Sequence, residues 1–303
     1  MKVLLIGANG FAGRYLRNEL ESCGYEVVGV DVVSDERTRK VDMLDPKASE
    51  EIIAEVKPDL IFNLAGQAAP SISWEKILLT MHLNIDISVN IANAVRIHCP
   101  KCRILLIGSA NQYDISRSET GIITEETPLN GSSPYDVSKN TQEELMRLMA
   151  KKYDLDIMMT RSFNHIGRGQ KTGFVVTDYC KRIVDLERGL IDTFNYGNLD
   201  SWRDFSDARD VVRAYRLIAE NGKSGEIYNV GSGKSVYIRD LIGALVEESK
   251  AAFEKTVLPP RLGDDELIHV RADISKLKSI CDFEPQYDVF ETVKDVLASF
   301  REA

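Results

Sequence analysis

The chain has 303 residues, of which 44% are hydrophobic and 28% are charged, so it can bury a full core as one large domain or two unequal lobes. A formal net charge of −9 and the lack of any lysine and arginine block disfavour nucleic acid as a partner. The apolar runs are far shorter than the roughly 18 to 20 residues of a membrane span, and the run after Met1 ends at Gly7, too early for a secretory signal, so we expect a cytoplasmic protein with no membrane partner.

The first half of the chain alternates short apolar runs with stretches of helical periodicity, which predicts parallel strands joined by crossover helices. The predicted strands cover 2–6, 26–30, 60–64, 103–108 and 156–161, and the predicted helices cover 11–23, 47–56, 77–98 and 135–153. The pattern indicates an α/β fold, a Rossmann-like doubly wound parallel sheet with a smaller C-terminal α/β substrate lobe. We expect the nucleotide-binding domain to span residues 1–163, with returns to the sheet near 204–231, and the substrate lobe to be mainly residues 164–303.

A glycine-rich turn follows the first predicted strand directly. It reads Gly7-Ala-Asn-Gly10-Phe-Ala-Gly13 and opens the first predicted helix. Glycines let backbone amides approach a pyrophosphate, and the helix N-terminus adds partial positive charge. Asp31 ends the second predicted strand, 31 − 13 = 18 residues past the last glycine, where a carboxylate binds ribose hydroxyls. The pair predicts a nicotinamide dinucleotide site, the alternative being a plain strand-to-helix turn in which Asp31 caps a loop.

The acid at position 31 also bears on the choice of cofactor. A carboxylate there repels a 2′-phosphate, which favours NAD(H). Three basic residues, Arg37, Arg39 and Lys40, follow closely in the sequence and would reach a 2′-phosphate if the loop folds back. NADP(H) therefore stays open at this point.

Tyr135 and Lys139 lie four residues apart at the start of a predicted helix, so their side chains share one face. A free tyrosine has a pKa near 10, and a neighbouring cation stabilises the phenolate and makes proton transfer at neutral pH easier. Ser109 ends the fourth predicted strand at the carboxyl edge of the sheet, where doubly wound folds bind their ligands. The three residues are candidates for moving a proton to or from a carbonyl oxygen.

The spacing of the glycines, together with Ser109, Tyr135 and Lys139, resembles the extended short-chain dehydrogenases. The resemblance implies that these three residues are the catalytic set and that Lys139 also binds the nicotinamide ribose. It implies that Asn84, on the predicted 77–98 helix, supports the site, the alternative being a polar residue on the helix face. Cofactor contacts are implied at Gly7, Asn9, Gly10, Phe11, Ala12, Gly13, Asp31, Asp42, Met43, Leu64, Ala65, Gly66, Tyr135 and Lys139.

Longer segments of the second half resemble one group within that family, the GDP-4-keto-6-deoxy-D-mannose reductases. The matching segments are Arg161–Gln170, Gly197–Asp207, Arg209–Tyr215 and Tyr228–Gly233. The resemblance implies that Asn164, Arg203 and Arg261 surround the sugar-nucleotide diphosphate, with Lys181 nearby. Arginine suits this role because its planar fork pairs with phosphate oxygens. The alternative for each arginine is a surface ion pair, of Arg203 with Asp204 or Asp207 and of Arg261 with Asp264 or Asp265.

Three positions depart from that group's pattern, Arg168 in place of proline, Asp114 in place of glycine, and Asp31 where enzymes that use NADPH often lack an acid. Ala110 and Asn111 stand where the related 4,6-dehydratases carry acids that eliminate water. We therefore expect reduction of a 4-keto-6-deoxy sugar nucleotide, most simply a GDP-sugar, by a homodimer built on the 77–98 and 135–153 helices. The alternatives are an NAD-dependent 4-epimerase and, further off, a 4,6-dehydratase or a non-catalytic NAD(P)-binding regulator.

The chain holds five cysteines, an odd number without a disulfide framework, which suits a reducing compartment. Cys99 and Cys102 form the one suggestive pair, typical of half a zinc site or of a redox couple. No second pair accompanies them, and they precede a strand and not a helix. We expect no metal.

Overall fold

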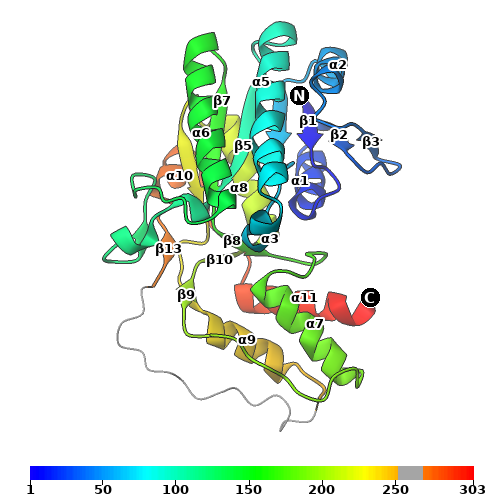
Figure 1. Ribbon diagram of the computed structural model, residues 1–303, viewed down its shortest axis with the longest axis vertical. Helices are drawn as coiled ribbons and strands as arrows, with labels where there is room; N and C mark the ends of the chain where they lie inside the picture. The colour runs from blue at the N-terminus through cyan, green and yellow to red at the C-terminus, as the bar shows by residue number, and fades with distance from the viewer. Residues whose placement is uncertain (252–268) are drawn as a thin grey trace.

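The computed structural model describes residues 1–251 and 269–303. Its centre is a sheet of seven strands in which all neighbours run parallel (Figure 1). Across the sheet the strands are β11 (Ile227–Val230), β7 (Ile157–Ser162), β5 (Arg103–Ser109), β4 (Leu60–Asn63), β1 (Lys2–Ile6), β2 (Glu26–Asp31) and β3 (Thr38–Lys40). The chain winds outward from β1 in both directions, which confirms the predicted Rossmann-like doubly wound fold.

The five predicted strands are confirmed to within one residue at each end. β3 was not predicted because Thr-Arg-Lys has no apolar pattern, and these residues form a strand by pairing with β2, with Gly29 opposite Thr38. β11 pairs with β7 and brings the chain back to the sheet inside the 204–231 segment. β3 therefore depends on its pairing with β2 more than on its own sequence.

Helices cover both faces of this sheet (Figure 1). The alternation of side chains along β1 serves both layers, since Leu4 and Ile6 pack toward one and Val3 and Leu5 toward the other. The first layer holds α2 (Pro46–Val56), α5 (Ile87–His98) and α6 (Pro134–Tyr153), and the second holds α1 (Phe11–Ser22), α8 (Ala208–Asn221) and α10 (Ser275–Ile280). Strands that are buried on both faces explain the continuous apolar runs in the sequence.

The prediction of a single regular α-helix over residues 77–98 is wrong for residues 82–86. The segment consists of α4 (Ile77–Met81), a π-helical turn at His82–Asp86, and α5, with α3 (Pro70–Glu75) before it. The π turn carries Asn84, whose fully buried side chain donates to Ser138 Oγ at 2.8 Å and accepts from the Gln67 amide at 2.9 Å. Those distant contacts shift the register, so apolar periodicity alone predicts one continuous helix.

A third apolar cluster lies beyond the carboxyl ends of the large sheet, among α7 (Val175–Glu187), α9 (Ile238–Glu247) and α11 (Val289–Glu302) (Figure 1). Three small sheets connect this region to the rest of the chain. They pair β8 (Asn164–Ile166) with β10 (Phe205–Asp207), β9 (Trp202–Arg203) with β12 (Val236–Tyr237), and β6 (Ile122–Ile123) with β13 (Arg271–Ala272). The boundary between residues 163 and 164 stays a prediction.

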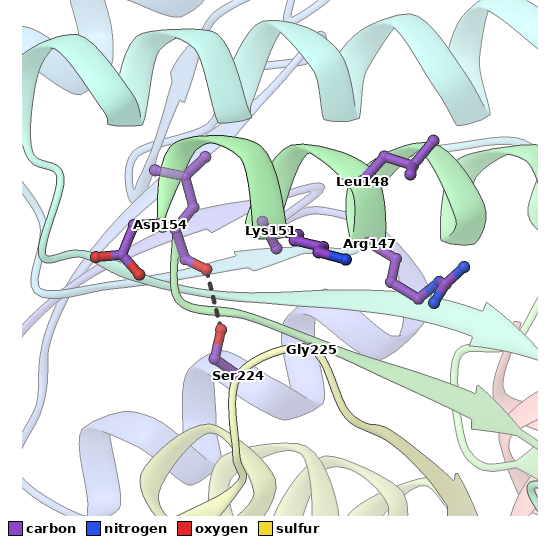
Figure 2. A pocket seen from close by; sticks show the side chains of 8 residues that line it. Arg147, Leu148, Lys151, Asp154, Ser224 and Gly225 are labelled. Carbon is purple, nitrogen blue, oxygen red and sulfur yellow. Dashed lines mark hydrogen bonds between the residues drawn. The ribbon is translucent and has the colours of Figure 1, made fainter.

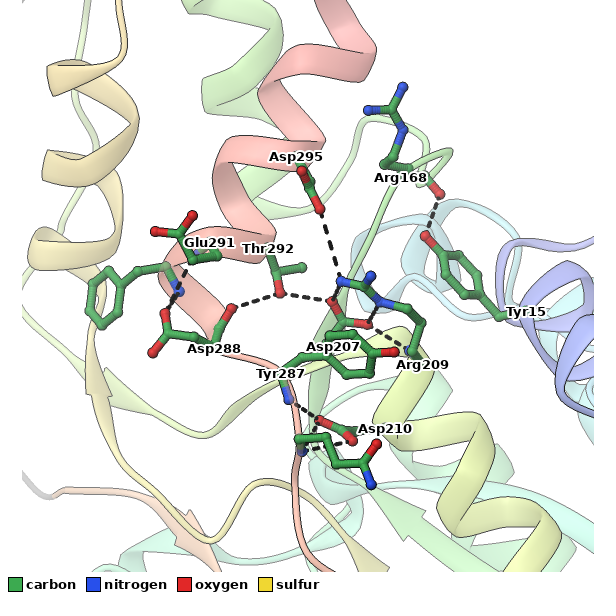
Figure 3. Close-up of polar contacts among 12 residues, drawn as sticks. Tyr15, Arg168, Asp207, Arg209, Asp210, Tyr287, Asp288, Glu291, Thr292 and Asp295 are labelled. Atoms are coloured by element: carbon green, nitrogen blue, oxygen red, sulfur yellow. Dashed lines mark hydrogen bonds and ion pairs between the residues drawn. The ribbon is translucent and has the colours of Figure 1, made fainter.

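Buried aspartates hold the segment that leads into α11 against the start of α8 (Figure 3). Asp207 caps α8 through the Arg209 amide and accepts from Thr292 Oγ1 on α11 at 2.7 Å. Asp210 accepts from the amides of Gln286 and Tyr287 at 2.9–3.0 Å. Each carboxylate thus gathers donors from both sides of the joint, which fixes where α11 lies.

We expect Asp210→Ala to lower the free energy of unfolding by about 3 kcal/mol, because it removes the buried partner of Arg213, 2.7 Å away, and the acceptor of the Gln286 and Tyr287 amides. Denaturant unfolding would measure this change. Asp295→Ala is the control, since that carboxylate is exposed and lies 3.9 Å from Arg209 in the same region. Equal effects of the two substitutions would contradict the role assigned to Asp210.

Candidate active site

The turn between β1 and α1 is shaped by close backbone contacts. Gly7 adopts a φ of +80°, and its amide and that of Ala8 donate to Val30 O at the end of β2. A Cβ on Gly13 would lie 2.2 Å from Gly7 O, so only glycine fits there. Gly10 is the N-cap of α1 and forms no side-chain cap, which leaves the helix N-terminus open to an anion. The turn, which includes the predicted contacts Asn9, Phe11 and Ala12, fits a pyrophosphate.

Asp31 closes this turn from the end of β2. Its carboxylate accepts from the Asn9 amide at 3.0 Å and from the Val33 amide at 3.4 Å, so it does cap the loop, as the simpler interpretation expected. Each carboxylate oxygen still has a second lone pair for a ribose hydroxyl. Asn9 in turn accepts from Thr38 Oγ1 at 2.8 Å and donates to Val33 O at 2.7 Å. The acid and the turn are therefore one rigid unit.

The end of β4 lies against the same turn. A Cβ on Gly7 would stand 2.8 Å from Ala65 N and 2.9 Å from the carbonyl carbon of Leu64, so Leu64 and Ala65 lie against the glycine-rich turn, and their cofactor contact stays a prediction. Gly66, the next residue, faces Asn84 of the π turn. Asp42 and Met43 follow β3 and have local roles. Asp42 accepts from the Leu44 amide at 2.9 Å, and the buried Met43 offers its carbonyl to Ser49 and Asn90.

Ser109 and Tyr135 meet at the carboxyl end of β5. Pro134 occupies the first turn of α6 and Ser133 caps the helix, which fixes the position of Tyr135. Burial raises the pKa of the Tyr135 hydroxyl to about 12, and the neighbouring Ser109 hydroxyl acts in the opposite direction. Tyr135 therefore holds its proton at neutral pH until a partner accepts it. Ser109 Oγ accepts from the Asn111 amide at 3.2 Å, which leaves its own O–H available as a donor.

Lys139 lies one turn further along α6 and is only 7% exposed. Its ammonium donates to Ile107 O at 2.8 Å and to Gln142 Oε1 at 3.2 Å. Burial lowers the pKa of Lys139 to about 8, because a cation loses its hydration there. Gly66 connects this group to Asn84, since a Cβ at position 66 would be 2.5 Å from Asn84 Oδ1 and 3.9 Å from Lys139 Nζ.

These positions define what the edge of the sheet can do. A hydroxyl donor, a protonated phenol and a buried ammonium adjoin a turn that is suited to a dinucleotide. The set can polarise a carbonyl, deliver a proton to its oxygen and return the proton in the reverse direction. No carboxylate occupies positions 110 or 111, where Ala110 and Asn111 follow the serine.

The four predicted substrate residues have different surroundings. Arg203, on β9, is half-buried, donates to Trp202 O at 2.8 Å, and has no carboxylate partner among residues 1–251 and 269–303, so the predicted alternative of an ion pair with Asp204 or Asp207 is wrong. Asn164 starts β8 and donates to Asp204 O at 3.2 Å, on the same side of the sheet. Lys181 is exposed on α7 and pairs with Asp185 at 2.6 Å. Arg261 lies outside the described residues.

Two functional side chains were not predicted from the sequence. Gln142 holds Lys139, and Gln112 accepts from the Ser109 amide at 2.9 Å. The i, i+3 spacing from Lys139 to Gln142 on a helix was a usable signal. The Ser-x-x-Gln spacing from Ser109 to Gln112, which is that of a capping box, was a second usable signal, whereas the bond of Gln112 to Glu143, 31 residues away, gave none.

The opposite end of α6 has a surface hollow lined by Arg147, Leu148, Lys151, Asp154, Ser224 and Gly225 (Figure 2). It begins roughly 12 Å along the helix from Lys139, and it lies away from the carboxyl ends of the strands. Cys99 and Cys102 are also at that end of the sheet, before β5, where the Cys102 amide donates to Cys99 O at 2.8 Å. The described part of the chain has no cluster of three or more residues suited to a metal. Across residues 1–251 and 269–303, none of the helices has both the length and the apolar character needed to cross a bilayer.

The doubly wound sheet, together with a glycine-rich turn that leaves the N-terminus of α1 uncapped, is typical of NAD(P)-dependent enzymes of the short-chain dehydrogenase type. The protein belongs to that class. The chain belongs to the NAD dependent epimerase/dehydratase family, whose profile matches residues 3–231. It is 27% identical to GDP-6-deoxy-D-mannose reductase of Pseudomonas aeruginosa over 300 residues, 99% of this chain and 97% of that protein. The predicted family is therefore confirmed.

Two solved structures have the same fold over the full length. RMD from Pseudomonas aeruginosa complexed with NADPH superposes with a TM-score of 0.86 at 25% identity and covers 99% of both chains. UDP-glucose 4-epimerase of Thermotoga maritima with UDP-glucose gives a TM-score of 0.86 at 25% identity, covering 100% of this chain and 99% of that one. A reductase and an epimerase thus resemble the chain equally in fold.

The buried ammonium gives a test by pH. Between the lowered pKa of Lys139, about 8, and the ordinary value near 10.4, the unfolded chain keeps a proton that the folded chain has released, so this group makes the protein more stable as the pH rises. We expect the unfolding free energy of the native protein to gain roughly 2–3 kcal/mol relative to Lys139→Met from pH 7 to pH 10. Lys151→Met, an exposed position on α6, is the control. A constant difference between native and Lys139→Met protein would contradict the buried charge.

Proposed function

We propose that the protein reduces the 4-keto group of a 4-keto-6-deoxy sugar nucleotide, with a GDP-sugar as the first candidate. The observation that carries the proposal is the environment of Tyr135, which is buried beside Ser109 with its pKa raised to about 12 and is therefore a proton donor at neutral pH. Reduction of a ketone needs a donor of this kind at the oxygen. Ala110 and Asn111 supply no acid for eliminating water, which disfavours a dehydratase.

In this mechanism the residues divide the work at one oxygen atom. Ser109 donates its O–H to the carbonyl oxygen, and Tyr135 transfers its proton there as negative charge develops. Lys139 stabilises the resulting phenolate through its ammonium, and Asn84 supports this arrangement from the π turn. The glycine turn, with Gly7, Gly10 and Gly13, and Asp31 hold the dinucleotide, whose reduced nicotinamide supplies the hydride when bound.

Recognition of the nucleotide sugar is assigned to Arg203 and Asn164, with Arg261 and Lys181 as the further residues that the resemblance implies. The half-buried guanidinium of Arg203 has a pKa lowered by burial and no acidic partner in the described chain, so a diphosphate is a suitable counter-ion. Lys181 supports the proposal less, because Asp185 already pairs with it. A cytoplasmic location is part of the same proposal.

NAD(H) is the cofactor that the loop after β2 supports. Asp31 presents a carboxylate at the ribose position, and two of the three basic residues in reach are already paired, Arg37 with Glu21 and Arg39 with Glu55. A 2′-phosphate would have to break those pairs or lie against Asp31. Of these three basic residues, only Lys40 has no carboxylate partner within residues 1–251 and 269–303, so it is the one cation left to receive a 2′-phosphate.

The second candidate is a nucleotide-sugar 4-epimerase. The observation in its favour is again Asp31, since an enzyme that returns the hydride to its own substrate retains one NAD. The same Ser109, Tyr135 and Lys139 would first remove and then return the proton. Purified protein carrying one NAD(H) per chain would favour this candidate over the reductase.

Turnover decides between the two. We expect oxidation of NADH when the protein is mixed with GDP-4-keto-6-deoxymannose, and no conversion of UDP-glucose to UDP-galactose. The measurement is absorbance at 340 nm across GDP-, UDP-, dTDP- and CDP-linked keto sugars, with NADH and NADPH in parallel. Conversion of a sugar nucleotide into its 4-epimer without net NADH consumption would replace the proposal with the alternative.

Tyr135→Phe separates the chemistry from binding. It should lower kcat at least about 100-fold while changing the Kd of the cofactor far less, because Phe keeps the ring and only the hydroxyl is lost. Tyr153→Phe removes a hydroxyl from an exposed position at the far end of the same helix and is the control. Full turnover by Tyr135→Phe would show that another group supplies the proton.

A homodimer is the assembly we propose. Exposed apolar side chains lie on the outer face of the two helices implicated by the sequence, Leu148 at 53% and Val137 at 40% on α6 and Ile97 at 56% on α5. A patch of this kind on paired helices suits a two-fold contact in which α5 and α6 face their own copies.

Light scattering at micromolar concentration should give the mass of two chains, and Leu148→Glu should shift it toward one, because a charge in the contact would lose its hydration. Leu190→Glu is the control, since Leu190 is 69% exposed just beyond α7 and away from that face. Native protein that stays monomeric at this concentration would contradict the proposed dimer.

A further inference from the structure

We propose that Gln112 is a positioning residue for the reaction, and that the buried ion pair of Glu143 and Arg161 anchors it so that Ser109 is held in place at the end of β5. The inference rests on the proposed function, since it concerns how Ser109 is oriented toward the reacting oxygen. It gives a role to Gln112, Glu143 and Arg161, none of which touches the dinucleotide turn or the candidate diphosphate residues.

Gln112 holds Ser109 with one end of its amide and is itself held at the other end. Its Oε1 accepts from the Ser109 amide at 2.9 Å, and its Nε2 donates to Glu143 Oε2 at 3.0 Å. The backbone of Gln112 is fixed as well, because the Asn130 amide donates to Gln112 O at 2.7 Å. The Gln112 side chain is fully buried, so breaking either bond would leave a buried polar group without its partner.

The anchor is a two-pronged ion pair between neighbouring elements. Arg161 on β7 donates from Nε to Glu143 Oε2 at 2.9 Å and from Nη2 to Glu143 Oε1 at 2.6 Å. The two side chains are 4% and 11% exposed. A third donor of Arg161 goes to Glu125 O at 3.0 Å, and its guanidinium lies over the Tyr113 ring. Fixed at so many points, Glu143 presents one oxygen to Gln112 in a constant place.

The space around Gln112 permits no other arrangement. A Cβ on Gly108 would stand 2.6 Å from Gln112 Oε1 and 2.2 Å from Thr160 O, so glycine is what lets the amide fold back under Ser109. A small cavity of about 10 Å³ adjoins Gln112, Gln142, Glu143 and Lys139, about the volume that one water molecule needs. The supports of Ser109 and Lys139 thus share one packed region, and a different rotamer at position 112 would have no room.

The consequence for Ser109 is that its amide and the acceptor side of its hydroxyl are both occupied. The amide points into Gln112, and Oγ accepts from the Asn111 amide within the turn that Gln112 closes. The serine O–H is then the remaining donor, directed to the oxygen that Tyr135 protonates. A misplacement of about 1 Å at such a group can cost about 100-fold in rate.

The test uses an isosteric change. Gln112→Glu keeps an acceptor for the Ser109 amide but places a second carboxyl 3.0 Å from Glu143 Oε2. The charged groups around position 112 are Glu143 and Lys139 from α6 and Arg161 from β7. Two adjacent carboxyls share a proton at low pH and repel when both ionise, so the shared pKa lies above the usual value near 4.3.

We expect kcat of Gln112→Glu, relative to native protein, to fall at least about tenfold from pH 5.5 to pH 8, with KM for the sugar nucleotide constant within about twofold. Gln112→Ala should lose about 10- to 100-fold in kcat at every pH, again without a change in KM. Glu144→Gln is the control, since Glu144 is the next residue on α6 and pairs with Arg147 at 2.9 Å on the surface. A ratio that does not depend on pH, or a loss in KM alone, would overturn the proposal.

Hydrogen exchange makes the result independent of the substrate. The Ser109 amide should exchange at least about tenfold faster in Gln112→Ala than in native or Glu144→Gln protein, because its acceptor is gone. Unchanged exchange at Ser109 overturns the inference whatever the native protein turns over. Native protein that turns over none of the nucleotide sugars, together with faster exchange, would overturn the proposed function and leave the structural anchoring of Ser109 in place.

Discussion

The close approach of one backbone to another at the carboxyl ends of the strands is the constraint on which the site depends. At Gly13 a methyl group would collide with Gly7 O, and at Gly108 with Thr160 O. These two contacts let α1 start directly behind β1 and let Gln112 fold under the end of β5. Parallel strands bring the dinucleotide turn and Ser109 to one edge, and the glycines decide how near the groups can come.

The buried charged groups on the two sides of that edge differ in how firmly they keep their charge. Lys139 is a buried cation held by a carbonyl and an amide, so burial makes it reluctant to stay protonated. Behind Ser109, Arg161 and Glu143 neutralise each other over two hydrogen bonds, so that buried pair keeps its charge. The first arrangement makes a group responsive to a nearby phenolate, and the second makes a rigid anchor.

Local patterns in the sequence predicted most of the strands and helices at the carboxyl edge of the sheet. The remaining features of that edge depend on contacts between residues far apart in the sequence. Strands that are buried on both faces have continuous apolar runs, which made them predictable. Tyr135 and Lys139 lie one helical turn apart, as their spacing predicted, because α6 is a regular helix there. β3 is polar and exists through its pairing with β2, while the π turn exists because Asn84 reaches Ser138. Partners such as Asp185 for Lys181 depend on rotamers that spacing alone does not fix.

Specificity has to arise outside the shared machinery, since a reductase and an epimerase have the same fold as this chain to the same TM-score. The proton transfer proposed for Tyr135 would serve either reaction. What separates them is how long the cofactor stays and which face of the keto sugar meets it, and these depend on the loop after β2 and on the lobe that carries Arg203. The β9 strand that holds this arginine pairs with β12 and leads through Asp204 into the joint at Asp207 and Asp210. If Arg203 binds the substrate as proposed, the substrate's orientation is linked to the packing of α8 and α11, while the proposed proton-transfer residues lie on β5 and α6.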